Sequence, residues 1–210
     1  MRLILVRHGE TDWNKQHRIQ GLGDLGLNKS GEKQAEALAC ALGHENLSAI
    51  YASPLKRAQE TAQAIARFHE LEVVTFDGLK ELDTGDLDGL TLEEMKSRYG
   101  GFIGEWLADA TEVRLPGGGS LTELQDQIWS VIEEIIDKHL EEDESGAVVV
   151  VSHFFASLCI ICRALGINLS DYRRLKVDVA AISTLEFNGK KTVLTCLNDT
   201  CHLKGAVCEE

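Results

Sequence analysis

The chain of 210 residues has no apolar stretch long enough to cross a bilayer. Behind Met1 and Arg2 there is also no long apolar segment of the kind found in secretory signals, so we expect a cytoplasmic protein without a membrane partner. Cations are scarce, because 21 Lys and Arg stand against 34 Asp and Glu, for a net charge of −13. Such an acidic chain is a poor partner for nucleic acid. Binding of an anionic small molecule would therefore depend on a few locally placed Arg and His residues.

The chain also lacks the second cysteine pair that a zinc site built on Cys159 and Cys162 would need. The pair lies in an apolar stretch at 157–165 that predicts a buried helix, so core packing explains it better than metal or redox chemistry. In a cytosolic protein we expect all six cysteines to be reduced thiols. No internal repeat and no long linker is present. The length and the 44% hydrophobic content fit a single domain over 1–210.

Short apolar runs alternate with segments of helical periodicity along the chain. Strands are predicted at 3–6, 49–52, 73–76 and 147–152, with a terminal hairpin formed by 179–187 and 191–197. Longer helices are predicted at 30–42, 54–68, 121–140 and 154–165. This alternation predicts an α/β fold, a three-layer sandwich in which a mostly parallel central sheet has helices on both faces.

Capping residues set the expected starts of the helices. Ser30 and Ser53 are the expected N-caps of the first two, because a hydroxyl oxygen there can accept a free backbone N–H. Two capping-box patterns open a short helix after 91 and the helix at 121–140, namely Thr91 with Glu94 and Ser120 with Glu123.

The most informative segment is the first strand and the residues that end it. The apolar run at 3–6 stops at Arg7, His8 and Gly9, and the carboxyl ends of strands are where ligands bind in α/β sheets. A second histidine, His153, directly follows the apolar strand at 147–152. If these strands are neighbours, the two imidazoles meet at one edge of the sheet.

Two further side chains could complete a phosphate-sized pocket there. Arg57 lies in the first turns of a predicted helix, and Glu81 lies in a loop rich in acids. Taken singly, each has an ordinary structural explanation: the arginines could be surface cations, the histidines satisfied loop residues and Glu81 a solvated carboxylate. Their ordered occurrence favours a functional site.

Four sequence blocks in this order resemble the histidine phosphatase superfamily, also called the phosphoglycerate mutase-like fold. The resemblance covers nearly the whole chain and implies the short phosphatase branch. The blocks are Leu5-Val6-Arg7-His8-Gly9-Glu10-Thr11-x-x-Asn14, Ser53-Pro54-Leu55-x-Arg57-Ala58-x-x-Thr61-Ala62, Glu81-Leu82-Asp83-x-Gly85-Asp86-x-x-Gly89 and Val150-Val151-Ser152-His153.

The resemblance implies a mechanism in which His8 attacks phosphorus and forms a phosphohistidine. Arg7, Arg57 and His153 would hold the phosphoryl oxygens. Glu81 would protonate the leaving alcohol and then deprotonate the attacking water. No metal and no cofactor is required, since cationic side chains take the place of Mg²⁺.

The resemblance also suggests residues around the substrate. Segment 91–120 is expected to form a helical, cap-like insertion beside the site. Chain-specific departures are Phe154-Phe155 after His153, which should narrow the pocket, and 24–27, where we expect only an altered turn. His202 either approaches the non-phosphate end of the substrate or lies in a plain surface tail. The expected substrate- or phosphate-binding residues are Asn14, Gln20, Thr84, His202 and the backbone N–H of Phe154.

The same phosphohistidine can serve two reactions. A phosphatase admits water, whereas a mutase excludes it and returns the phosphate to a second hydroxyl. The resemblance implies that the glycolytic mutases of the family carry a longer insertion between the general acid and the final histidine, which helps to close the site. The shorter stretch from Glu81 to His153 in this chain therefore favours a phosphatase that acts on a small phosphorylated metabolite. A cofactor-dependent phosphoglycerate mutase and a non-catalytic phospho-ligand sensor stay as alternatives. The terminal hairpin could also pair across a homodimer.

Overall fold

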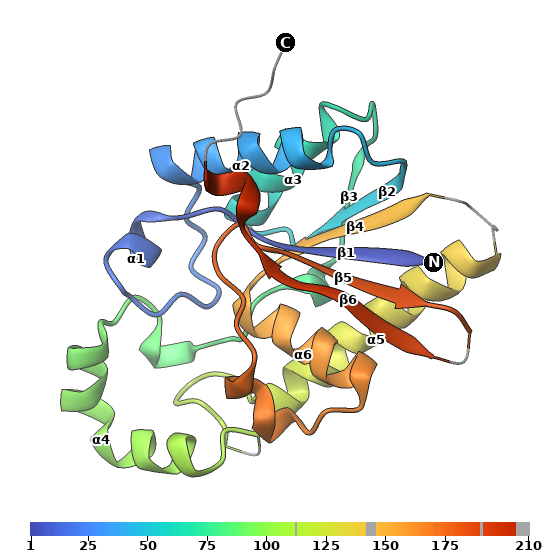
Figure 1. Ribbon diagram of the computed structural model, residues 1–210. Coiled ribbons are helices and arrows are strands. Elements are labelled where there is room, and N and C mark those ends of the chain that lie inside the picture. Colours follow the sequence, from blue (N-terminus) through green and yellow to red (C-terminus); the bar gives the residue numbers. More distant parts are fainter. Residues whose placement is uncertain (112, 142–145, 190, 205–210) are drawn as a thin grey trace.

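The computed structural model describes residues 1–111, 113–141, 146–189 and 191–204 (Figure 1). A six-stranded sheet in the order β3-β2-β4-β1-β5-β6 forms its centre. The first four strands of that order run parallel, and β5 and β6 are antiparallel additions at one edge. The strands are β1 (Arg2–Arg7), β2 (Leu47–Ala52), β3 (Val73–Thr75), β4 (Ala147–Ser152), β5 (Ile182–Phe187) and β6 (Thr192–Asp199).

Helices cover both faces of this sheet, which confirms the three-layer α/β sandwich. Figure 1 shows α2 and α3 on one face, α5 and α6 on the other, and α4 to one side of both layers. None of the helices in the described residues is both long and apolar enough to cross a membrane. The helices are α1 (Asp12–Lys15), α2 (Lys29–Leu42), α3 (Lys56–Ala66), α4 (Leu92–Ala108), α5 (Leu121–Glu141) and α6 (Phe154–Leu165).

Burial on both faces explains why the central strands are apolar without alternation. In β1, Leu3 and Leu5 join a hydrophobic cluster with α5 and α6, whereas Ile4 and Val6 join a second cluster with α2 and α3. All six residues of β4 are buried. The core therefore consists of two layers that share the sheet.

The strand register brings the ends of β1 and β4 together. Arg7 pairs with Ser152, and the His8 amide donates to the Ser152 carbonyl oxygen at 3.0 Å. His8 and His153 therefore leave neighbouring strands at the same edge of the sheet, as the sequence predicts.

Both predicted capping boxes are present, but two predicted N-caps are wrong. Helix α2 begins one residue early, because the Asn28 side chain accepts the amides of Ser30 and Gly31 at 2.9 Å each. Helix α3 begins at Lys56, with Leu55 rather than Ser53 at the N-cap position and extended in backbone. Ser53 lies too far upstream to cap a helix that starts there.

The cysteines divide into two kinds. Cys159 and Cys162 are free and fully buried in α6, and burial raises the pKa of Cys162 to about 11, so these thiols are packing residues. Cys40 is disulfide-bonded, and the expectation that all six cysteines are reduced is wrong. Pairing depends on the distance between two thiols, which the fold sets and the sequence pattern does not reveal.

Candidate active site

The two predicted histidines form the centre of the site. Their ring centroids lie 5.1 Å apart with an interplanar angle of 60°, and both rings are buried. Nδ1 of His8 donates to the Gly9 carbonyl oxygen at 2.7 Å, which leaves the lone pair on Nε2. Gly9 also packs closely against the backbone of Gly31, because a Cβ on Gly9 would lie 2.7 Å from the Gly31 carbonyl oxygen.

The surroundings keep both imidazoles neutral. Burial lowers the pKa of His8 well below 6.5, and the charges of Arg57 and then Arg7 lower it further. The pKa of His153 is lowered by burial, by Arg57 and by His8. A neutral imidazole with an unprotonated Nε2 is the form that can act as a nucleophile.

The arginines approach the histidines from different elements. Arg57 of α3 is fully buried, and its Nε donates to His8 Nε2 at 3.2 Å. Arg7 at the end of β1 donates from Nη1 to the Val177 carbonyl oxygen at 2.7 Å, and its Cζ lies 5.1 Å from the ring centre of Phe154. Burial lowers the pKa of Arg57 to about 10, so the side chain keeps its charge at neutral pH.

Several buried polar atoms near these residues have no partner in the described part of the chain. They include Nε of Arg7, Nε2 of Gln20 and both ring nitrogens of His153. Thr11 orients Gln20 by donating to its Oε1 at 2.7 Å, and its amide donates to Oδ1 of Asn14 at 3.0 Å. Unsatisfied buried donors are costly, and donors beside two arginines are suited to an anion.

Glu81 lies across the N-terminus of α6. Its carboxylate accepts the amides of Leu82 at 2.9 Å, Phe155 at 3.2 Å and Ala156 at 3.3 Å. Burial raises the pKa of Glu81, and this effect outweighs the lowering by these hydrogen bonds and by Arg57 and Arg7. A buried carboxyl with a raised pKa is able to carry a proton to a reacting group.

The comparison with known proteins assigns this arrangement to a family. The model of the histidine phosphatase superfamily (branch 1) matches residues 3–200. The chain belongs to the histidine phosphatase superfamily. Phosphoserine phosphatase 1 of Hydrogenobacter thermophilus is 37% identical over 203 residues, which cover 97% of this chain and 94% of that protein.

Solved structures agree with the family assignment. A mycobacterial glucosyl-3-phosphoglycerate phosphatase in complex with VO3 has a TM-score of 0.87 at 28% identity, covering 95% of this chain and 99% of its own. A phosphoserine phosphatase from Entamoeba histolytica has a TM-score of 0.80 at 31% identity, covering 96% and 98%. This histidine phosphatase chain is therefore a phosphatase, as its sequence predicts.

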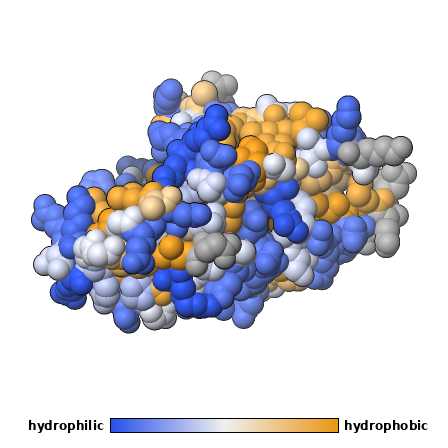
Figure 2. Space-filling view, turned by 90° about the horizontal axis from the view of Figure 1, so that it is seen from below, coloured by the Kyte–Doolittle hydropathy of each residue, from blue (hydrophilic) through white to orange (hydrophobic). Residues whose placement is uncertain are grey.

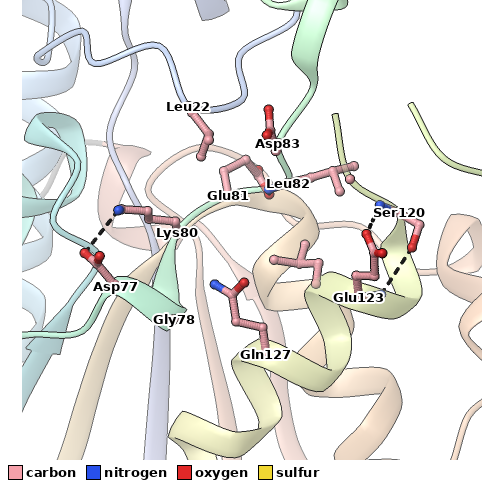
Figure 3. Close-up of a pocket in the computed structure, with 12 residues that line it drawn as sticks. Leu22, Asp77, Gly78, Lys80, Glu81, Leu82, Asp83, Ser120, Glu123 and Gln127 are labelled. Carbon is pink, nitrogen blue, oxygen red and sulfur yellow. Dashed lines mark hydrogen bonds and ion pairs between the residues drawn. The ribbon is translucent and has the colours of Figure 1, made fainter. Parts of the chain in front are cut away.

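A pocket of about 580 Å³ opens beside Glu81 in this histidine phosphatase. Figure 3 shows Leu22 and Asp83 near Glu81 at one end of the pocket, and Gln127 projecting from α5 at the other. The capping box of Ser120 and Glu123 forms part of the wall. Glu81 thus lines this pocket, while its carboxylate binds the N-terminus of α6, directly after His153.

Two predicted substrate residues make other contacts. The Thr84 hydroxyl donates to Oδ1 of Asp88 at 3.3 Å. His202 is buried, with Nε2 at 3.0 Å from the Ala180 carbonyl oxygen, and it lines a pocket between α2 and the β5–β6 hairpin. A plain surface position for His202 is therefore wrong. The contacts predicted between these side chains and substrate stay predictions.

Helix α4 supplies aromatic side chains next to α6. The Trp106 ring lies 6.2 Å from that of Phe155, which lies 5.0 Å from that of Phe154. No residue of α4 is buried, and Leu92 and Leu107 are 52% and 62% exposed. Figure 2, with α4 at the left, shows apolar surface on this part of the molecule.

Two carboxylates for which the sequence predicts no role bind backbone amides close to the site residues. Asp24 Oδ1 accepts the Lys56 amide at the start of α3 at 2.7 Å, so the departure at 24–27 does more than alter a turn. Asp88 Oδ1 and Oδ2 accept the amides of Gly21 and Gly23 at 2.7 and 2.8 Å. The only signal for Asp88 in the sequence is its place inside the third block.

Proposed function

We propose that the protein is a metal-independent phosphomonoesterase that works through a phosphohistidine on His8. The observation that carries this proposal is the pair of neutral imidazoles 5.1 Å apart, with the ring nitrogens of His153 buried and unpartnered beside two arginines. A tetrahedral phosphoryl group would supply the missing acceptors for the one N–H of the neutral His153 ring and for Arg7 Nε.

In the first step His8 Nε2 attacks phosphorus and the bond to the ester oxygen breaks. The bond from Nδ1 to Gly9 keeps the reacting nitrogen unprotonated, and the Arg57 Nε–H that it accepts at 3.2 Å would turn to a phosphoryl oxygen. Arg7, Arg57 and His153 stabilise the charge on the phosphoryl oxygens in the transition state. Asn14, Gln20 and the backbone N–H of Phe154 are the further donors that we propose for the phosphoryl group.

The leaving alcohol takes a proton from Glu81, because an alkoxide is a poor leaving group. A bound phosphate raises the pKa of Glu81 beyond the effect of burial, since two negative charges would otherwise lie close together. In the second step Glu81 accepts a proton from water, and the resulting hydroxide attacks the phosphohistidine. This step releases inorganic phosphate and returns His8 and Glu81 to their starting states.

For the substrate we propose a small phosphorylated metabolite, and phosphoserine is the first to test. The relative at 37% identity is named a phosphoserine phosphatase. The compact chain between Glu81 and His153 supports hydrolysis over mutase transfer, which needs a site closed to water. We further propose that segment 91–120, which contains α4, acts as a cap over the leaving group.

The test is a panel of phosphorylated metabolites in EDTA, scored in the same tubes for released phosphate and for isomerised product. We expect phosphate release and an acid-labile phosphoenzyme in the wild type, and neither in His8→Ala. Interconversion of 2- and 3-phosphoglycerate that depends on bisphosphoglycerate would establish a mutase instead. Phosphate binding without any phosphoenzyme would establish a sensor.

A further inference from the structure

Asp88 binds both backbone amides of a glycine loop. Its two carboxylate oxygens accept from Gly21 at 2.7 Å and from Gly23 at 2.8 Å, and the Thr84 hydroxyl donates to Oδ1 at 3.3 Å. Hydrogen bonds to an ionised acceptor are shorter and stronger than those between neutral groups. The loop at 21–23 is therefore fixed from its N–H side by one carboxylate.

The same two glycines are bound from their carbonyl side by Arg57. Nη2 donates to the Gly21 oxygen and Nη1 to the Gly23 oxygen, at 2.8 Å each. This leaves Nε directed at His8 Nε2, at 3.2 Å. Each of the three guanidinium nitrogens of Arg57 thus makes a hydrogen bond, and the position of the loop fixes the position of the guanidinium.

The loop has no room for a side chain at either glycine between these two charges. A Cβ on Gly21 would lie 2.3 Å from the Thr84 hydroxyl oxygen, and a Cβ on Gly23 would lie 2.8 Å from the Trp13 ring and 3.0 Å from Asp88. Only glycine allows this approach of backbone to side chains.

We propose that Asp88 is a positioning residue for catalysis, which holds the 21–23 loop so that the loop aims Arg57 at His8 and at the phosphoryl group. This proposal rests on the proposed function, in which Arg57 stabilises the transition state. With Glu81 and Asp24, the Asp88 charge also raises the pKa of Arg57 against the lowering by burial and by Arg7, so it supports the charged form as well as the position.

The test compares Asp88→Asn with Asp88→Glu and with a matched control, Asp86→Asn. Asp86 is an exposed acid two residues away. In Asp88→Asn one acceptor becomes an N–H donor that faces a loop amide, and a misplaced catalytic group costs up to about 100-fold in rate. With p-nitrophenyl phosphate we expect kcat/KM to fall about 10- to 100-fold in Asp88→Asn, to recover in part in Asp88→Glu and to stay at the wild-type value in Asp86→Asn.

Hydrogen exchange of the segment around 20–25 is measured on the same variants, because it reports on the loop without any need for turnover. We expect faster exchange in Asp88→Asn and wild-type exchange in Asp86→Asn. If Asp88→Asn exchanges faster but keeps the wild-type kcat/KM, Asp88 does not position Arg57 for catalysis. If exchange in Asp88→Asn is unchanged, Asp88 does not hold the 21–23 loop. If the wild type shows no phosphoenzyme, the proposed function fails, but the exchange data still show whether Asp88 holds the 21–23 loop.

A milder variant covers the case in which Asp88→Asn does not fold. Thr84→Val removes only the hydroxyl that donates to Asp88, at nearly the same volume. We expect a few-fold loss of kcat/KM and a small increase in exchange in the same segment. No change in either quantity in Thr84→Val, together with a misfolded Asp88→Asn, would assign Asp88 to folding alone.

Discussion

Replacing Glu81 by glutamine tests the proton transfer most directly. The substitution keeps the shape of the side chain and one carbonyl oxygen for the amides at 2.9 to 3.3 Å, but removes the acidic proton. A positioned general acid contributes about 10²- to 10⁴-fold in rate, which corresponds to roughly 3 to 5 kcal/mol of barrier. We therefore expect kcat/KM for an alkyl phosphate such as phosphoserine to fall by at least about 100-fold.

The loss depends on the leaving group. A nitrophenolate leaves without a proton, so kcat/KM for p-nitrophenyl phosphate, which reports on the first phosphoryl transfer, should fall less than about 10-fold in Glu81→Gln. Glu81→Asp is the matched control. This variant keeps the carboxyl but moves it away from the Phe155 and Ala156 amides by the length of one methylene group. Its kcat/KM for the alkyl phosphate should therefore lie between the values of the wild type and of Glu81→Gln.

The pH dependence gives an independent reading of the same variant. Because burial raises the pKa of Glu81, the protonated form persists above the usual range of a carboxyl, and kcat/KM of the wild type should fall as pH rises through that raised pKa. The fall should be absent in Glu81→Gln. Equal losses for both substrates, or an unchanged pH profile in the variant, would refute the assignment of Glu81 as the acid.

Three further predictions concern other groups. Arg57→Lys cannot reach both loop carbonyls and His8, so kcat/KM should fall about 100- to 1000-fold in a p-nitrophenyl phosphate assay. The pKa values of His8 and His153 are lowered in the folded protein. On acidification these histidines therefore bind protons at a higher pH in the unfolded chain than in the folded protein. The free energy of unfolding should thus fall as pH drops below about 6.5, by roughly 1 kcal/mol per histidine per pH unit. Over the same pH range, the thermal midpoint of His153→Gln should drop less than that of the wild type. Asn28→Ala should cost about 1 kcal/mol and lower the midpoint by about 2 to 4 °C, with Ser30→Ala close to wild type.

The sequence predicts the architecture well because the core follows from periodicity. The apolar run in β4 is continuous since the strand is buried on both faces, and its neighbours β1 and β2 are parallel to it. The positions of His8 and His153 after these strands predict that the two rings meet if the strands are neighbours, and the pairing of β1 with β4 meets that condition. Burial follows from the local pattern of apolar residues, whereas the adjacency and register of β1 and β4 come from the fold.

The loop at 21–23 could not be predicted in the same way. Its conformation depends on Asp88 and Arg57, which lie 65 and 34 residues away from Gly23 in the chain. No periodic signal connects the three segments. Only the placement of Arg57 and Asp88 in the family's blocks suggested a common site. The loop at 21–23 lies outside those blocks, and the blocks assigned no contact to Asp88.

The N-termini of the helices show where the adjacent sequence no longer predicts which group binds the first backbone amides. Helices α4 and α5 carry their own capping boxes, and α2 is capped by the adjacent Asn28. Helices α3 and α6 have no side-chain cap of their own. Distant carboxylates accept their first amides instead, Asp24 for α3 and Glu81 for α6.

These two helices are the ones that carry Arg57 and follow His153. Their N-termini are bound by carboxylates from other segments, so the same bonds that complete the helices also join the separate parts of the site. A local cap would satisfy the amides equally well but would leave Glu81 without its anchors. Failure of the local capping rule at α3 and α6 therefore marks the two helices whose N-termini join distant segments of the site, whereas α1, which carries Asn14, has a capping box of its own.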